Sequence, residues 1–222
     1  MTRKITIISL ALAVFVILFV SLRINKAIHT RESTHIFGND TIHYTEKLKW
    51  KRGNLESIDY GDGNIIKFEY GEKNRLVKTI YDKNKTICYF YNDKLLHKVE
   101  IYSDTVFSEM FELEYIESKI SKIEGTVYHL TDSERIVKHQ KERALSLVFP
   151  GISFFSIFEF CKEAIEKNNI EAGTPCAYTI DLTWEGEDLV KKVFTSGNHS
   201  RTSVITYDRR GGGCPVVSYS YE

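Results

Sequence analysis

The sequence has little proline and no net charge, and both absences exclude classes of protein. Only three of its 222 residues are proline, which excludes collagen-like chains and proline-rich linkers. The 30 lysine and arginine residues balance the 30 aspartate and glutamate residues, whereas a dedicated nucleic-acid binder usually gathers a basic excess on one face. Charged residues make up 27% of the chain and hydrophobic residues 42%. These values are typical of a folded globular protein and exclude a disordered one.

Motifs that would carry familiar chemistry are also missing. No C-x-x-C occurs, which argues against structural zinc and thioredoxin-like redox sites, and no G-x-S-x-G marks a hydrolase nucleophile. The seven histidines lack the spacing of metal ligands. The glycines at 211–213 are followed by Cys214 and not by the Lys-Ser/Thr of a phosphate-binding loop. We therefore predict a non-enzymatic protein with no catalytic residues, no metal site and no cofactor.

The longest apolar run lies near the N-terminus. Arg3 and Lys4 precede the run 5–22, which only three hydroxyl-bearing residues interrupt. As a helix, its ~18 residues would extend about 27 Å, enough to cross a thin bilayer core. The alternative is a cleaved secretory signal, but the apolar part of such signals is usually shorter and no A-x-A-like site follows here. We predict that residues 1–30 are a membrane anchor or signal segment, with residues 5–22 in the membrane.

The positive charges beside this run nearly balance, so they do not fix its orientation. They are Arg3, Lys4, Arg23, Lys26 and Arg31. The short N-terminal flank is typical of the start of an export signal, and long domains translocate largely regardless of their charge. We predict a single-pass protein of the cell membrane whose C-terminal domain lies on the exported side, periplasmic or extracellular.

From Trp50 onward the sequence repeats a unit of two short alternating segments joined by a turn. The returning segments end at Tyr70, Tyr91 and Tyr115, at intervals of 21 and 24 residues. Self-similarity at such intervals indicates stacked supersecondary units, each too small to bury its apolar face alone.

Each unit has the local chemistry of a β-hairpin. Asp62-Gly63 is a strong turn signal, because glycine accepts the positive φ of a primed turn. In the returning segment, Phe68 and Tyr70 alternate with charged residues. This alternation predicts a strand with one buried and one solvent-exposed face. The pattern resumes at 177–184. The predicted fold class is mainly β: an antiparallel meander of repeated β-hairpins that forms a twisted sheet.

Helical signals interrupt this pattern at about 132–168. Residues 131–134 match a capping box, and a helix from there would end at Pro150. Further on, apolar residues recur at helical spacing: Phe154, Phe158, Cys161 and Ile165. We predict one or two inserted helices that pack on the sheet. A helix lying on the membrane surface is the alternative.

The predicted organisation has three parts. They are the N-terminal segment 1–30, a linker at 31–49, and a β-hairpin repeat domain at 50–222 that contains the helical insertion.

The four cysteines are even in number and widely spaced: Cys88, Cys161, Cys176 and Cys214. Four cysteines allow three pairings, and buried free thiols are an equal alternative. If one bridge forms, we expect Cys161 with Cys176, because the chain between them can turn back at Gly173 and Pro175.

The segment 68–81 carries a family resemblance. Its sequence, Phe-Glu-Tyr-Gly-Glu-Lys-Asn-Arg-Leu-Val-Lys-Thr-Ile-Tyr, resembles the tyrosine–aspartate (YD, or RHS-like) repeat, and residues 183–191 and 205–208 are similar. Gly71 stands where the repeat usually has aspartate, and Asn74 where it usually has glycine. The chain as a whole is similar to surface or periplasmic proteins of Bacteroidetes-type bacteria. That resemblance implies a few hairpins behind an export signal, too few for the closed shells of large RHS proteins.

Aromatic residues at strand ends provide one binding hypothesis. They are Trp50, Tyr60, Tyr81, Tyr102 and Trp184. If exposed, such a row could stack on sugars or hold a partner protein, and if buried it is core. We therefore expect a membrane-anchored cell-envelope protein with a binding or scaffolding role and a protein or glycan partner. A small hydrolase that acts on envelope or extracellular glycans is the alternative.

Protease and thiol-label accessibility on intact cells tests the predicted topology. We expect added protease to cleave the region after residue 50 without lysis, because that region is predicted to be exported. Lysed cells provide the control for cleavage. Protection of the whole C-terminal region from both reagents would reverse the orientation.

Overall fold

The computed structural model describes residues 26–37, 40–61, 63–82, 84–128, 135–149, 152, 155–168, 171, 174–208 and 216–221. The chain divides into two compact units, Met1–Leu76 and Val77–Glu222. The predicted membrane segment 5–22 lies outside the described residues. Among the helices that are described, none is long and apolar enough to cross a membrane.

The described part of the first unit is a meander of four strands with a short 3-10 helix, η1, at Glu72–Asn74. The strands are β1 (Lys26–Phe37), β2 (Asp40–Lys51), β3 (Asn54–Asp59) and β4 (Ile65–Tyr70). Each pairs antiparallel with the next. The predicted linker at 31–49 was wrong, because β1 and β2 pair along their full lengths there. Their threonines and isoleucines favour strands. In β2 the alternation of Ile42, Tyr44, Leu48 and Trp50 with polar residues is a strand signal that the linker prediction overlooked.

The hairpin of β3 and β4 confirms the predicted alternation. Ile58 and Ile66 are paired and fully buried, and Phe68 is also buried. Lys67 and Glu69 on the opposite face are exposed. The connection bends at Gly61, whose φ of 86° is one that side chains disfavour.

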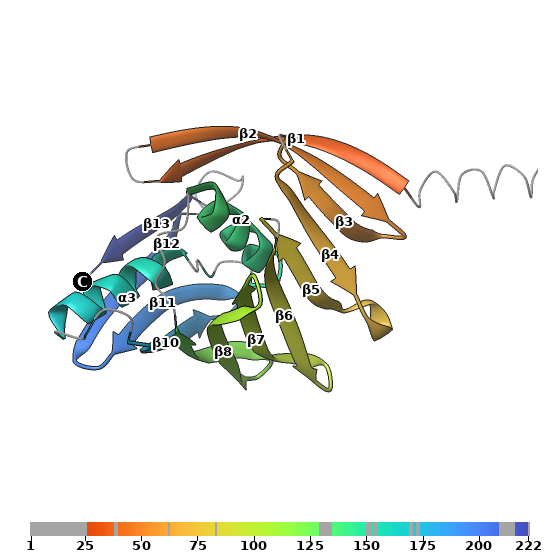
Figure 1. The fold of residues 1–222 in the computed structure, drawn as a ribbon. Helices are drawn as coiled ribbons and strands as arrows, with labels where there is room; N and C mark the ends of the chain where they lie inside the picture. Colours follow the sequence, from red (N-terminus) through yellow and green to blue (C-terminus); the bar gives the residue numbers. More distant parts are fainter. Residues whose placement is uncertain are drawn as a thin grey trace, which may run out of the picture. The chain divides into compact units, whose positions relative to one another are not determined.

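The second unit contains nine strands among its described residues. They are β5 (Leu76–Tyr81), β6 (Lys85–Asn92), β7 (Leu95–Ser103), β8 (Val106–Ile116), β9 (Lys119–Val127), β10 (Cys176–Glu185), β11 (Asp188–Ser196), β12 (His199–Asp208) and β13 (Val216–Tyr221). Consecutive strands pair antiparallel throughout, as Figure 1 shows. The predicted antiparallel meander is confirmed.

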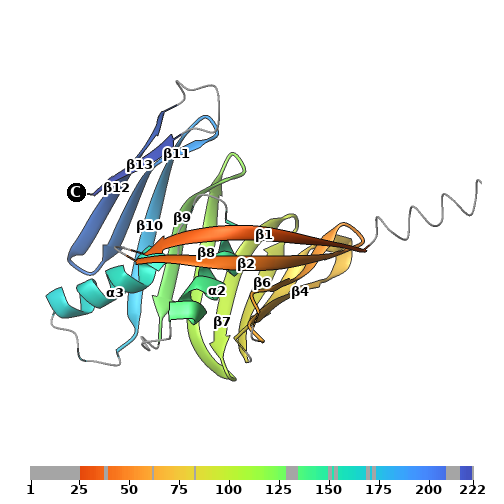
Figure 2. The ribbon, with the colours of Figure 1, turned by 90° about the horizontal axis from the view of Figure 1, so that it is seen from above.

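Two helices lie between β9 and β10 in sequence: α2 (Arg135–Ser146) and α3 (Phe155–Lys167). They cover one face of the β5–β13 sheet, called the inner face below (Figures 1 and 2). α3 contacts α2 and strands β10, β11 and β12. The predicted helical insertion is confirmed, whereas its predicted capping box at 131–134 lies outside the described residues.

The buried face of α3 includes residues that differ in part from the predicted ones. Its fully covered residues are Ile157, Phe160, Cys161 and Ala164. Ile165, which was expected on this face, is half-exposed, and the side chains of Phe154 and Phe158 are outside the described ones. The ring of Phe160 lies 5.6 Å from that of Phe194 on β11. α3 therefore packs on the sheet, as predicted.

One glycine in a strand allows a large side chain to lie across the inner face. Gly125 on β9 is paired with Phe111 on one side and Tyr178 on the other. A Cβ atom on Gly125 would overlap the Tyr178 ring and lie 2.8 Å from its Cε1 atom. The missing side chain thus makes room for the ring, which is one reason glycine occurs within a strand.

Replacement of this glycine should therefore destabilise the protein. We expect Gly125→Ala to lower the free energy of unfolding by about 1–3 kcal/mol, because the added methyl group overpacks the site. Urea denaturation measures the loss. The matched control is Thr126→Ala, the next residue on the opposite face, which should change stability by less than about 0.5 kcal/mol. Equal effects of the two substitutions would contradict the close approach of Tyr178.

Candidate functional site

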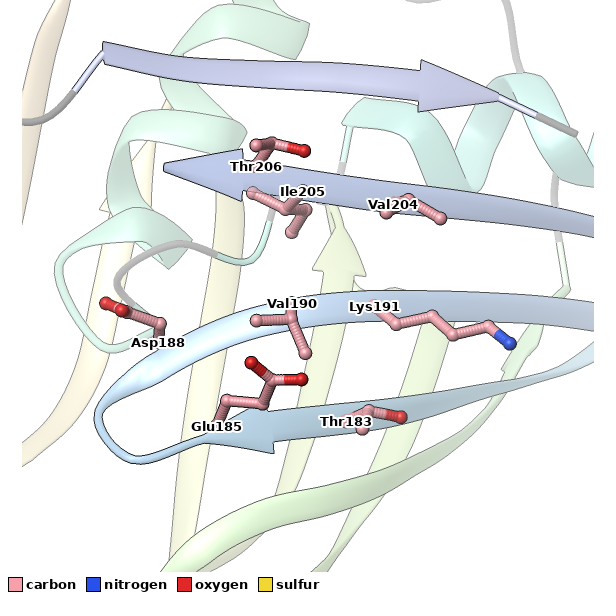
Figure 3. A pocket seen from close by; sticks show the side chains of 8 residues that line it. All are labelled: Thr183, Glu185, Asp188, Val190, Lys191, Val204, Ile205 and Thr206. Atoms are coloured by element: carbon pink, nitrogen blue, oxygen red, sulfur yellow. The ribbon is translucent and has the colours of Figure 1, made fainter. Parts of the chain in front are cut away.

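A hollow of about 620 Å³ lies on β10, β11 and β12, and we call it the strand hollow (Figure 3). Thr183, which lines it, alternates with buried Leu182, so the hollow opens on the face turned away from the helices. Its centre is apolar, with half-buried Val190 and Val204 beside buried Ile205. The site therefore offers an apolar patch on the face of the sheet that is turned away from the helices.

A β-bulge creates the local shape of this hollow. Thr183 pairs with Lys191, but the next residue, Trp184, pairs with Leu189. Val190 is thus an extra residue on β11 that has no partner on β10. Bulges re-aim side chains and often lie beside functional sites. Here the bulge brings Val190 and Lys191 to the same hollow.

The end of the strand hollow nearest the β10–β11 turn is acidic. Glu185 and Asp188 both line it, and Lys191 lies farther along β11. In Figure 3 the carboxylate of Glu185 extends toward Val190, whereas that of Asp188 lies at the turn and points away from it. The two carboxylates share the hollow but do not face a common point.

A second hollow of about 360 Å³ adjoins the first and shares Thr183 with it. Trp184 lines this second hollow, and its indole Nε1 donates a hydrogen bond to the Ile120 carbonyl oxygen at 2.7 Å. The Lys119 ammonium lies 6.0 Å from the centre of the indole, within the range of a cation–π contact. The ring is therefore held in place, with a cation over it.

The other predicted aromatic residues do not form one exposed row. Tyr81 is only 2% exposed and belongs to the core, where burial raises the pKa of its phenol. Tyr102 is half-buried and donates a 2.7 Å hydrogen bond to Glu100, which raises the pKa of Tyr102 to about 12. Trp50 and Tyr60 lie in the first unit, and both are half-buried. Of the five residues, only Trp184 lines one of the two hollows described here.

Beneath α2, a buried carboxylate joins the helix to the sheet. Glu109 on β8 forms an ion pair with Lys141 of α2 and accepts a hydrogen bond from the Tyr178 hydroxyl at 3.3 Å. The Glu109 side chain is only 5% exposed. Burial raises the pKa of Tyr178 well above its usual value, and the negative charge of Glu109 adds to the shift. The sequence analysis missed this contact, although Glu109 lies in the same alternating register as Phe111.

A second polar contact holds α3 on β12. The imidazole of His199 stacks on Phe160 with ring centres 5.0 Å apart. Its Nε2 lies 3.5 Å from Glu163, and Arg201 lies 3.5 Å from the same carboxylate. The contacts of His199 therefore join β12 to α3. Among the described residues, no group of three or more His, Cys, Asp and Glu side chains could hold a metal ion.

The cysteines that were expected as a pair lie together. Cys161, Cys176 and Cys88 are free thiols, while Cys214 lies outside the described residues. The thiols of Cys161 and Cys176 are hydrogen-bonded to each other. The two sulfurs are therefore adjacent, and the disulfide between them stays a prediction.

Removal of one partner from the Glu109–Lys141 pair should be costly. We expect Lys141→Met to lower the free energy of unfolding by about 3 kcal/mol, because it leaves the Glu109 charge buried without its cation. The double variant Glu109→Gln/Lys141→Met should recover most of that loss in urea denaturation. Glu112→Gln, at an exposed position of the same strand, is the control. A double variant no more stable than Lys141→Met would contradict the buried charge as the cause.

Comparisons with known proteins show no family. No protein-family model matches the chain, and no curated protein matches it. A solved structure described as "Crystal Structure of TcdB2-TccC3-TEV" is similar at 14% sequence identity and a TM-score of 0.24. That match covers 85% of this chain but only 12% of the other one.

Proposed function

We propose that this protein is a non-enzymatic, membrane-anchored component of the cell envelope that binds a partner protein through the strand hollow. The observation that carries the proposal is the composition of the hollow, an apolar centre with an acidic end. Protein interfaces commonly combine an apolar core with a polar rim.

The charges of the hollow indicate the chemistry of its partner. Glu185 and Asp188 outnumber Lys191, so a complementary surface would carry basic side chains around an apolar one. A glycan has less support, since no aromatic side chain lines the strand hollow. The nearest candidate platform, Trp184, already has Lys119 over its ring.

The proposed location rests on the N-terminal sequence. The apolar run 5–22 behind Arg3 and Lys4 supports an anchor, with the described units on the exported side. The meander of successive hairpins in each unit is consistent with the resemblance to YD-like repeats of Bacteroidetes-type envelope proteins.

The alternative, a hydrolase of envelope glycans, has less support from the same hollow. Glycosidases use two carboxyl groups that flank the scissile bond. Glu185 and Asp188 do line one hollow, but their carboxylates do not point toward a common place in Figure 3. Binding therefore accounts for this arrangement better than acid–base catalysis does.

Tryptophan fluorescence can test the proposed binding chemistry. Trp50 and Trp184 are the two tryptophans of the chain, so Trp50→Phe leaves Trp184, beside the hollow, as the reporter. We expect a peptide of alternating lysine and valine to shift the emission of the full-length protein saturably. A glutamate–valine peptide of the same length should bind at least about tenfold more weakly, since its charges repel the acidic end.

Charge reversal supplies the matched control for this titration. Glu185→Lys with Asp188→Lys should abolish the preference for the basic peptide, whereas Glu124→Lys, at an exposed position on β9, should retain most of it. Equal binding of both peptides, or an equal effect of both variants, would contradict the hollow as the docking site.

A further inference from the structure

Two cysteines meet where the helical insertion rests on the sheet. Cys161 lies in the middle of α3 and Cys176 is the first residue of β10. Both side chains are covered, with 0% and 1% exposure, and their thiols are hydrogen-bonded to each other. The Cys176 sulfur also lies 3.5 Å from the Ser196 hydroxyl on β11. The two sulfurs therefore lie next to each other where α3 packs against β10.

We propose that Cys161 and Cys176 are a redox modification site that forms an intramolecular disulfide by exchange with a small disulfide such as oxidised glutathione. The bond would fasten α3 covalently to β10. This inference goes beyond the proposed binding function and does not depend on it. It also leaves Cys88 aside, because that residue is half-buried on β6 at a position that alternates with buried Ile87 and Tyr89 and so faces away from the helices.

The surroundings of the two cysteines indicate which thiol attacks glutathione first and which attacks second. The hydrogen bond from Cys161 lowers the pKa of Cys176, and the nearby hydroxyl of Ser196 acts in the same direction. The pKa of Cys161 is raised, first by its hydrogen bond with Cys176 and then by burial. Opening of α3 separates Cys176 from Cys161, but Ser196 stays beside Cys176 because both residues lie on the sheet. We therefore assign the first attack to Cys176, because the thiolate is the attacking species in thiol–disulfide exchange.

The exchange balances in two displacements. The Cys176 thiolate attacks one sulfur of oxidised glutathione, which forms a mixed disulfide and releases one glutathione thiolate. Cys161 then loses its proton and attacks the Cys176 sulfur, which displaces the second glutathione thiolate. Both released thiolates take up protons. In sum, the two protein thiols are oxidised and one glutathione disulfide is reduced to two glutathione thiols.

Burial controls when this reaction can occur. Glutathione cannot reach covered sulfurs, so the first displacement needs α3 to separate from the sheet or to be still undocked during folding. In the folded protein the rate should therefore follow the opening of α3. Contacts that hold the helix, such as that of His199 with Glu163, should slow the reaction.

The bond should stabilise the fold measurably. It would close a loop of about 15 residues, which in the chain-entropy model lowers the unfolding equilibrium constant by about a hundredfold. An exported domain would meet the oxidising conditions in which such bonds persist.

The test uses the purified full-length protein with Cys88→Ser and Cys214→Ser, so that only the proposed pair remains. After reduction, the protein is equilibrated with mixtures of reduced and oxidised glutathione and then alkylated. We expect intact-mass spectrometry to show the loss of two hydrogen atoms, and peptide mapping to join Cys161 to Cys176. Dilute urea should accelerate the reaction, and the oxidised form should resist unfolding better than the reduced form.

Single substitutions complete the design. Cys161→Ser in the same background should stop at a mixed disulfide with glutathione on Cys176, and only when α3 opens. Far-UV circular dichroism verifies that each variant is folded. Failure of the folded two-cysteine protein to form the bridge under strongly oxidising mixtures, or oxidation without any gain in resistance to urea, would overturn the proposal.

Discussion

The inner face of the β5–β13 sheet has to be covered, and the structure of the second unit depends on how this is achieved. Strands such as β6 and β10 place apolar side chains on that face at every second position, and residues such as Phe111, Ile123 and Ile180 are fully buried there. A single sheet cannot bury its own face, so a second layer is required. The segment between β9 and β10 supplies it as α2 and α3. Phe149, just after α2, meets Phe111 with ring centres 5.8 Å apart.

Polar contacts fix where this covering layer lies. Apolar packing alone is non-directional, whereas Glu109 with Lys141 and His199 with Glu163 each join one helix to one strand. Such buried or half-buried pairs contribute little net stability, but they favour one placement of the helices over others. The adjacent thiols of Cys161 and Cys176 lie between the two layers, one on α3 and the other on β10.

The sequence predicted the features that depend on local periodicity. Alternation around Phe68 and Phe111 identified the strands, and the steps of three and four residues identified α3, because both patterns follow from backbone geometry. β1 was missed because a largely polar strand leaves little amphipathic signal, whereas β2 carries an alternation from Ile42 to Trp50 that only Glu46 interrupts and that was overlooked. The strand hollow was missed for another reason. It depends on the bulge at Val190 and on three strands meeting in register, which no single segment encodes.

Among the described strands, each one after the first of its unit pairs with the strand that precedes it in sequence. Contacts between sequence neighbours keep the contact order low, which favours rapid folding. A chain that emerges progressively from a ribosome or a translocation channel could therefore add one strand at a time to a growing edge. The step from β9 to β10 is the exception, since about fifty residues of helix and loop separate the two strands and a longer loop must close there.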